Sequence, residues 1–218
     1  MAELTATRWQ PLDGGKPRGL VVLCHGLGAL GSHWAGFVTA VRPLLPHVLF
    51  AAPDGPEAMA GGAPGRRWWD YHNRSAGFAE AGVQAAAAAF DRFLAAERRA
   101  HDLPATRCAL AGFSQGAMTV LHAAPRHAEA PAAVLSIAGR LLAPERLAGE
   151  IACRPPVLLI HGADDINVRP EESSRAAEHL RQAGVEAAAL LLDGLAHAID
   201  ARASATGGAF LRARLAPA

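Results

Sequence analysis

A serine lies at the centre of the pentapeptide Gly112-Phe113-Ser114-Gln115-Gly116. The apolar run 108–111 precedes it, and a helix-forming stretch follows it. Gly-x-Ser-x-Gly between a strand and a helix is typical of a nucleophile elbow, a sharp turn that exposes a serine hydroxyl at the end of a sheet. Side chains at Gly112 and Gly116 would collide with the neighbouring strand and helix. The pattern predicts that Ser114 attacks a carbonyl carbon; the alternative is a glycine-rich turn with an idle serine.

A serine nucleophile requires a histidine base and a carboxylate that orients the base. In an open α/β sheet such groups come from the loops that follow the strands. Asp164 and Asp165 follow the apolar run 157–161, and His197 follows the run 187–192. The order serine, aspartate, histidine is the chain order of α/β-hydrolases. We therefore predict that His197 is the general base, which takes the serine proton and returns it to the leaving group.

The choice between Asp164 and Asp165 is not made by these residues alone, because adjacent side chains in an extended loop point in different directions. Only one of the two can reach His197. Among the other histidines, His25 and His161 precede glycines at strand ends, which favours a role in shaping turns. The sequence has no His-Glu-x-x-His pattern and no paired Cys/His cluster, so we predict neither a metal site nor a cofactor.

An oxyanion hole needs two backbone N–H groups directed at the negative charge that develops on the substrate oxygen. One donor is expected from Gln115, the residue after the nucleophile. The other is expected from a loop after an earlier strand. The loop His25–Gly28 follows the first apolar run and contains two glycines, and we assign the second donor to Leu27. A turn that only links a strand to a helix is the alternative.

The elements that must position these groups are visible as alternating apolar and helical stretches. Continuous apolar runs predict parallel strands that are buried on both faces. The predicted strands are 20–24, 47–52, 107–111, 132–138, 157–161 and 187–192. The predicted helices are 32–45, 76–100, 114–127, 170–183 and 200–215, the last with an interruption at Gly207-Gly208. This alternation predicts an α/β fold with a mostly parallel central sheet and helices on both faces.

The chain is expected to form one α/β domain over residues 1–218, because no shift in composition and no internal repeat marks a boundary. Residues 1–18 leave room for an antiparallel N-terminal strand. Residues 53–67 are rich in Gly, Pro and Ala and are predicted to form a surface loop.

Composition excludes several classes of function. Lys plus Arg number 21 and Asp plus Glu number 20, and no basic stripe predicts binding to nucleic acid. No apolar stretch approaches the roughly 18 residues of a membrane-spanning helix, and the N-terminus lacks a signal pattern, so stable membrane insertion is not expected. The three cysteines are an odd number, and two lie in apolar runs. Buried reduced thiols are therefore expected, which favours a cytoplasmic protein.

The motifs as a set resemble the phospholipase/carboxylesterase family of α/β-hydrolases, which includes bacterial carboxylesterases and acyl-protein thioesterases. The motifs that carry the resemblance, between about Gly19 and Phe210, are His25–Gly28, Trp34, Trp69-Asp70, Gly112–Gly116, His161–Asp165 and His197. The resemblance implies that the catalytic acid is Asp165, within His-Gly-x-x-Asp, and that the oxyanion amides are those of Leu27 and Gln115. The chain departs from the family at Ala196, where glycine is usual, and in the polar stretch 70–74. These departures concern the substrate and leave the triad intact.

Together the residues and the resemblance predict hydrolysis of a small-molecule or lipid-like carboxylic ester through an acyl-enzyme. Candidate residues of the acyl pocket are Trp34, Trp69, Ile166 and Val168, and packing in the core is the alternative for each of them. An acyl-protein thioesterase or lysophospholipase with the same triad is a second enzymatic interpretation. A ligand-binding module without catalysis is the alternative from another class, because a fold does not fix a function. Formation of a homodimer is left open.

Overall fold

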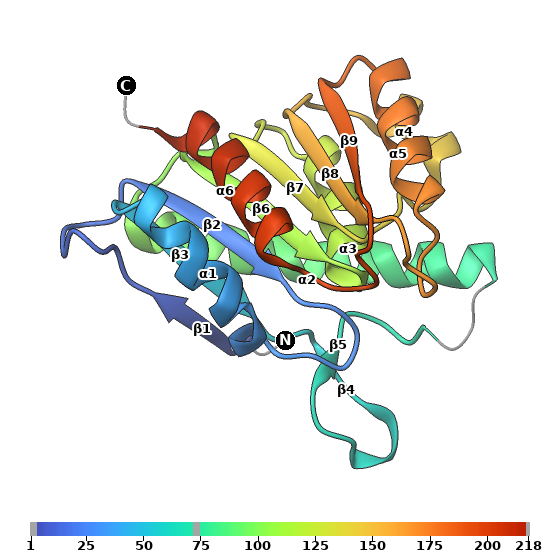
Figure 1. Ribbon diagram of the computed structural model, residues 1–218, viewed down its shortest axis with the longest axis horizontal. Helices are drawn as coiled ribbons and strands as arrows, with labels where there is room; N and C mark the ends of the chain where they lie inside the picture. The colour runs from blue at the N-terminus through green and yellow to red at the C-terminus, as the bar shows by residue number, and fades with distance from the viewer. Residues whose placement is uncertain (1–3, 72–74, 217–218) are drawn as a thin grey trace.

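A seven-stranded sheet forms the centre of the computed structural model, which describes residues 4–71 and 75–216 (Figure 1). The strand order is β1-β3-β2-β6-β7-β8-β9. The strands are β1 (Ala6–Trp9), β2 (Gly19–Cys24), β3 (Val48–Pro53), β6 (Cys108–Phe113), β7 (Ala133–Ile137), β8 (Val157–Gly162) and β9 (Ala187–Leu192). β1 pairs antiparallel with β3, and the other neighbours pair in parallel. The predicted mostly parallel α/β fold is confirmed.

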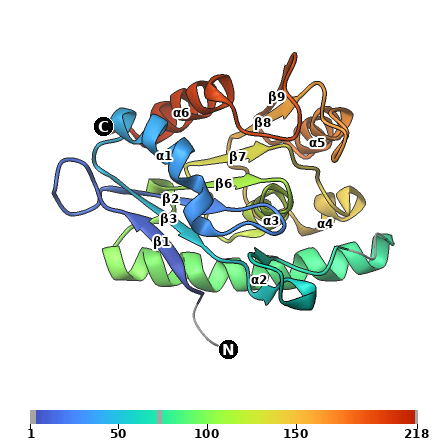
Figure 2. The same cartoon turned by 60° about the horizontal axis from the view of Figure 1, so that its bottom comes forward.

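Helices cover both faces of this sheet. They are α1 (Ala35–Val41), α2 (Ala76–His101), α3 (Gln115–Ala123), α4 (Leu147–Glu150), α5 (Glu171–Gln182) and α6 (Ala201–Leu215). α1 and α6 pack on one face, and α2, α3 and α5 pack on the other (Figure 2). Every residue of β2, β3 and β7 is buried. Burial on both faces explains why the strand sequences are continuously apolar rather than alternating.

The C-terminal helix α6 is continuous, so the interruption predicted at Gly207-Gly208 is wrong. A Cβ on Gly207 would lie 2.7 Å from the Leu135 Cδ2, and a Cβ on Gly208 would lie 2.9 Å from the Val41 Cγ2. The glycines therefore allow α6 to approach β7 and α1 closely. Tertiary packing compensates for their poor helix propensity, which a sequence pattern alone does not reveal.

The N-terminal segment and the 53–67 segment have short strands. β1 lies within residues 1–18, of which residues 1–3 are outside the described part of the chain. Within 53–67, β4 (Glu57–Ala58) pairs antiparallel with β5 (Arg66–Arg67). The resulting hairpin projects below the sheet in Figure 1. The segment expected to be a surface loop thus carries a small strand pair of its own.

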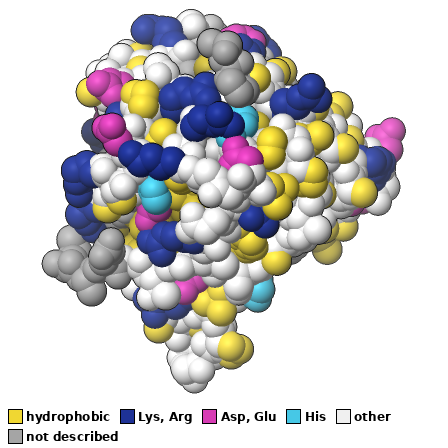
Figure 3. Space-filling view, turned by 90° about the vertical axis from the view of Figure 1, so that its left-hand side faces the viewer, with side chains coloured by type: hydrophobic (Ala, Val, Ile, Leu, Met, Phe, Trp, Pro, Cys, Tyr) yellow, Lys and Arg dark blue, Asp and Glu magenta, His cyan; other side chains and the backbone are white. Residues whose placement is uncertain are grey.

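The charges on the surface and the state of the cysteines both match what the sequence predicts. On the face shown in Figure 3, lysine and arginine side chains are interspersed with acidic ones. Cys24, Cys108 and Cys153 are buried and unpaired. Burial raises the pKa of the Cys108 thiol to about 11, so this thiol is protonated at neutral pH.

A close approach of two backbones fixes the segment that follows β2. The N–H of Gly31 donates to Asp54 Oδ1 over 2.8 Å, and a Cβ on Gly31 would lie 2.0 Å from the Ala52 carbonyl oxygen. The neighbouring Gly36, in α1, has no heavy atom within 4 Å of the position that a Cβ would take. Only the first of these two glycines is therefore required by packing.

We predict that Gly31→Ala lowers the free energy of unfolding by roughly 2 kcal/mol or more, because the new methyl group overlaps a backbone carbonyl that cannot rotate away. Gly36→Ala is the matched control and should be neutral or stabilising by up to about 1 kcal/mol, since alanine favours the helix. Urea denaturation of both variants measures the difference. Equal stability of the two variants would contradict the close approach.

Candidate active site

Ser114 occupies a strained turn between β6 and α3. Its backbone has φ 53° and ψ −116°, which a non-glycine residue rarely adopts. A Cβ on Gly112 would lie 2.4 Å from the carbonyl carbon of Gly116, and a Cβ on Gly116 would lie 2.1 Å from the Cys24 carbonyl oxygen. The two glycines are thus required by contact with backbone, as the pentapeptide predicts. The turn leaves the serine hydroxyl at the carboxyl end of the central strand.

A chain of hydrogen bonds joins Ser114, His197 and Asp165. The Ser114 Oγ lies 2.9 Å from His197 Nε2, and His197 Nδ1 lies 2.6 Å from Asp165 Oδ2. An ionised carboxylate only accepts, so Nδ1 carries the ring proton and Nε2 is free to accept the serine proton. The three side chains follow β6, β8 and β9, and the structure therefore brings together the predicted base, acid and nucleophile.

The loop that carries His197 is held against the end of β8. A Cβ on Gly162 would lie 2.2 Å from the Leu195 carbonyl oxygen. The N–H of Asp164 donates to the same carbonyl over 2.9 Å. The rings of Phe113 and His197 also pack with their centroids 4.9 Å apart. These contacts fix the imidazole between the nucleophile and the acid.

The two adjacent aspartates differ in their surroundings. Asp165 is 5% exposed, whereas the side chain of Asp164 is on the surface. Asp165 Oδ1 accepts the N–H groups of Asn167 and Val168 over 2.8 and 3.0 Å. Burial is the largest single influence on Asp165 and opposes its ionisation, but the hydrogen bonds from His197 and these two amides outweigh it and lower the pKa of Asp165. Asp165, which the family resemblance implies as the acid, is thus the one of the two aspartates that is hydrogen-bonded to His197.

The two amides predicted to bind the oxyanion belong to segments that meet at Ser114. The loop after β2 packs against the elbow, since a Cβ on Gly26 would lie 3.4 Å from Ser114 Cβ. Within residues 4–71 and 75–216, the N–H groups of Leu27 and Gln115 donate no hydrogen bond. Gln115 is also the first residue of α3, where the helix dipole is positive. Both amides thus lack an acceptor among the described residues.

The loop that carries Leu27 is fastened on two sides. His25 Nδ1 donates to the Gly26 carbonyl over 2.7 Å, while its Nε2 accepts the N–H of Gly55 over 2.8 Å. Burial lowers the pKa of His25, which favours the neutral ring. A neutral imidazole can donate from one nitrogen and accept at the other. Arg66, at the start of β5, exchanges backbone hydrogen bonds of 2.9 Å with Gly28 and Ala29. The β4–β5 hairpin is therefore linked directly to the candidate oxyanion loop.

The Gln115 side chain has a role that the sequence did not predict. Its Oε1 accepts the N–H of Trp68, and its Nε2 donates to the Trp69 carbonyl, each over 2.9 Å. Trp68 Nε1 in turn donates to the His25 carbonyl over 2.9 Å. The Gln115 side chain thus links the tryptophan segment to the elbow.

A cavity of about 300 Å³ adjoins His197. Its lining includes Trp34, Phe113, His197 and Ile199, together with the glycine-containing loop after β2. Of the four predicted pocket residues, only Trp34 lines this cavity. Apart from three histidines, the side chains that line the cavity are apolar, which suits a short acyl or alcohol group.

The other three predicted pocket residues lie elsewhere. Trp69 is 2% exposed and packs against Gly82 of α2, where a Cβ would lie 2.3 Å from the indole ring. Ile166 is 93% exposed. Val168 is buried, and its backbone N–H donates a hydrogen bond to Asp165 Oδ1. Hydrophobicity indicated these residues but could not say whether each faces solvent, core or cavity. Of the polar stretch 70–74, residues 72–74 are outside the described part of the chain.

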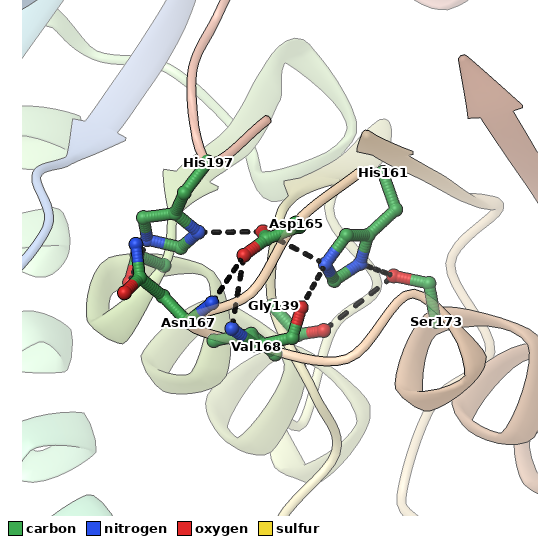
Figure 4. A network of polar contacts seen from close by, with 8 residues as sticks. Gly139, His161, Asp165, Asn167, Val168, Ser173 and His197 are labelled. Atoms are coloured by element: carbon green, nitrogen blue, oxygen red, sulfur yellow. Dashed lines mark hydrogen bonds and ion pairs between the residues drawn. The ribbon is translucent and has the colours of Figure 1, made fainter. Parts of the chain in front are cut away.

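The sequence favours a role for His161 in shaping a turn, but the structure places its ring against the Asp165 carboxylate (Figure 4). The signal that could have indicated this contact is the spacing of four residues between His161 and Asp165.

No group of three or more metal-ligating side chains is found among the described residues. Over the same residues, none of the helices combines the length and hydropathy that crossing a bilayer requires.

Comparison with known proteins gives a family match over most of the chain. The family model described as Phospholipase/Carboxylesterase matches residues 13–214. An acyl-protein thioesterase 1 homolog from Dictyostelium discoideum is 28% identical over 185 residues, which are 81% of this chain and 82% of that protein. Esterase YpfH from Escherichia coli (strain K12) is also 28% identical, over 84% of this chain and 77% of that protein.

The structural comparison extends this match to the whole fold. The crystal structure of esterase PE8 superposes with a TM-score of 0.92 at 33% sequence identity. The superposition covers 98% of this chain and all of the other chain. The geometry described above therefore occurs on a scaffold shared with an esterase.

We predict that Asp165→Asn lowers kcat for p-nitrophenyl acetate by about 10⁴-fold, because an amide N–H directed at His197 Nδ1 forces the wrong tautomer on the ring. The matched control is Asp164→Asn, which changes the adjacent exposed carboxylate and should retain wild-type turnover. Steady-state kinetics of the two variants checks the assignment. A loss confined to the Asp164 variant, or shared equally, would contradict it.

Proposed function

Because the chain belongs to the phospholipase/carboxylesterase family of α/β-hydrolases, we propose that it is a serine hydrolase that cleaves carboxylic esters through an acyl-enzyme intermediate. The observation that carries this proposal is the hydrogen-bonded chain from Ser114 through His197 to Asp165. The amides of Leu27 and Gln115, which donate no hydrogen bond among the described residues, support it. The proposed nucleophile is Ser114, the base His197 and the acid Asp165.

Acylation begins when the ester carbonyl carbon lies against the Ser114 Oγ. His197 Nε2 takes the hydroxyl proton as Oγ attacks, and the carbonyl oxygen gains a negative charge. The N–H groups of Leu27 and Gln115 stabilise that charge, and ionised Asp165 stabilises the imidazolium. The imidazolium then protonates the departing alkoxide, the carbon–oxygen bond breaks, and the acyl group remains on the serine as an ester.

Deacylation repeats these steps with water as the nucleophile. His197 Nε2 removes a proton from water as the oxygen attacks the acyl carbonyl, and the same two amides hold the second oxyanion. When this intermediate collapses, the bond to Ser114 Oγ breaks and the proton returns to the serine. The carboxylic acid leaves, and the hydrogen-bonded chain is restored.

Thioester hydrolysis is a second candidate activity with the same residues. It is supported by the similarity to the Dictyostelium acyl-protein thioesterase homolog. A thiolate is a better leaving group than an alkoxide, so the triad needs no additional part for that reaction. A lysophospholipid would be cleaved in the same manner at its acyl ester. A purely ligand-binding role is disfavoured, because it would leave the strained serine and the aligned imidazole without a purpose.

The proposal also includes the domain organisation of the protein and its cellular compartment. One sheet runs from β1 to β9, which supports a single domain over the chain. The three buried, unpaired cysteines support a reducing compartment such as the cytoplasm.

We predict that the protein hydrolyses p-nitrophenyl esters and that Ser114→Ala lowers kcat by on the order of 10⁴- to 10⁶-fold, because the nucleophile is lost. A fluorophosphonate probe should label the wild-type protein at Ser114 and leave this variant unlabelled. Ser174→Ala, an exposed serine on α5, is the control and should behave as the wild type. A folded wild-type protein with neither labelling nor turnover would rule the proposal out.

The cavity beside His197 gives a prediction about chain length. Ile199→Phe adds bulk to a lining residue and should lower kcat/KM for p-nitrophenyl hexanoate roughly 10-fold or more relative to the acetate, an effect of the size that one methylene group has in an apolar pocket. Ile199→Ala should shift the ratio in the opposite direction. Leu191→Phe on β9, outside this cavity, serves as control. An unchanged ratio in both Ile199 variants would show that the cavity holds no part of the substrate.

A further inference from the structure

His161 is a completely buried imidazole at the end of β8 whose two nitrogens both have partners. Its Nε2 lies 3.1 Å from Asp165 Oδ2 and 3.0 Å from the Val168 carbonyl oxygen. Its Nδ1 lies 2.7 Å from the Ser173 Oγ at the start of α5. Figure 4 shows His161 and His197 approaching Asp165 from opposite sides. The ring therefore connects a strand, a loop and a helix around the carboxylate.

The partners determine where the ring proton lies. Both groups near Nε2 are acceptors, a carboxylate and a carbonyl, so Nε2 must carry a hydrogen that the two oxygens share. Burial is the largest influence on His161 and lowers its pKa, which keeps the ring neutral. Nδ1 then has a free lone pair and accepts a hydrogen bond from the Ser173 hydroxyl group. The Gly139 carbonyl, 3.4 Å from the same hydroxyl, is the more distant alternative acceptor.

This N–H completes the hydrogen bonding of the buried carboxylate. Asp165 Oδ1 accepts from the amides of Asn167 and Val168, and Oδ2 accepts from His197 and His161. Among the described residues, the ion pairs of Asp165 involve only the two imidazoles and no arginine or lysine. Four N–H donors thus take up the acceptor sites of a carboxylate that burial would otherwise neutralise.

We propose that His161 is a positioning residue of the reaction. Its Nε2–H bond to Oδ2 holds Asp165 in place for His197, and the same N–H holds the loop that carries Asp165 through the Val168 carbonyl. This proposal rests on the proposed ester hydrolysis. His161 does not line the cavity beside His197, so it acts through the acid and does not touch substrate. Its loss should therefore lower kcat and leave KM unchanged.

The test compares three substitutions that keep different parts of the ring's function. His161→Gln places an amide N–H near the position of Nε2 and keeps the donor to Asp165. His161→Asn is too short to reach Asp165 but can still meet Ser173 near the position of Nδ1. His161→Leu removes both interactions at similar volume. We expect kcat for p-nitrophenyl acetate to fall roughly 10- to 100-fold in the Leu and Asn variants, the usual effect of losing a hydrogen bond to a charged group.

The Gln variant should recover most of the wild-type kcat, and KM should be the same in all folded variants. The rate of labelling of Ser114 by a fluorophosphonate should follow kcat, because labelling needs the same base. Far-UV and near-UV circular dichroism establishes folding. If the Leu variant fails to fold, the Gln and Asn pair decides.

Wild-type kcat in a folded Leu variant, or equal activity of the Gln and Asn variants, would overturn the positioning role. A rise in KM without loss of kcat would overturn it also, because it would place His161 in substrate binding. Absence of both labelling and turnover in the wild-type protein is a different result. It would overturn the proposed function and this proposal with it.

Discussion

Contact between backbones at the nucleophile elbow is the constraint on which the rest of the site depends. A Cβ on Gly116 would lie 2.1 Å from the Cys24 carbonyl oxygen, so the start of α3 touches the end of β2. The strained backbone of Ser114, which typically costs about 1–3 kcal/mol, is held in place by this packing. Because the same contact brings the loop after β2 against the elbow, the proposed nucleophile and the proposed oxyanion donors are positioned by one feature. The rigidity of that feature is what preorganised catalysis requires.

The electrostatics of the site follow a second constraint: the Asp165 carboxylate is buried, and no lysine or arginine among the described residues forms an ion pair with it. Asp165 is surrounded by N–H groups from two imidazoles and two backbone amides. An arginine at the same place would stabilise the carboxylate more strongly, but it would also repel the imidazolium that forms on His197 in the proposed mechanism. Dipolar donors stabilise Asp165 in its charged state and leave its attraction for that imidazolium intact.

The sequence predicts the framework well where burial on both faces of the sheet dictates composition. The strand predicted at 187–192 has the same bounds as β9 in the structure. β8 extends beyond its predicted range, 157–161, only by Gly162. Side chains that lie directly after strands can also be identified, which is why spacing and order point to Ser114, His197 and one of two adjacent aspartates. The choice of Asp165 over Asp164 depends on hydrogen bonds across a folded loop, and the glycines of α6 depend on the closeness of its neighbours. Both are properties of packing that leave no periodic signal in the chain.

The two histidines that precede glycines at strand ends show what a turn residue can contribute beyond a turn. His25 bridges the oxyanion loop to the backbone of Gly55, and His161 bridges the acid loop to α5. In both cases burial keeps the ring neutral, so that one nitrogen donates while the other accepts. A charged lysine or arginine can only donate, and a carboxylate can only accept. A buried neutral imidazole is therefore suited to joining two segments of backbone beside a catalytic group without adding a charge that would disturb it.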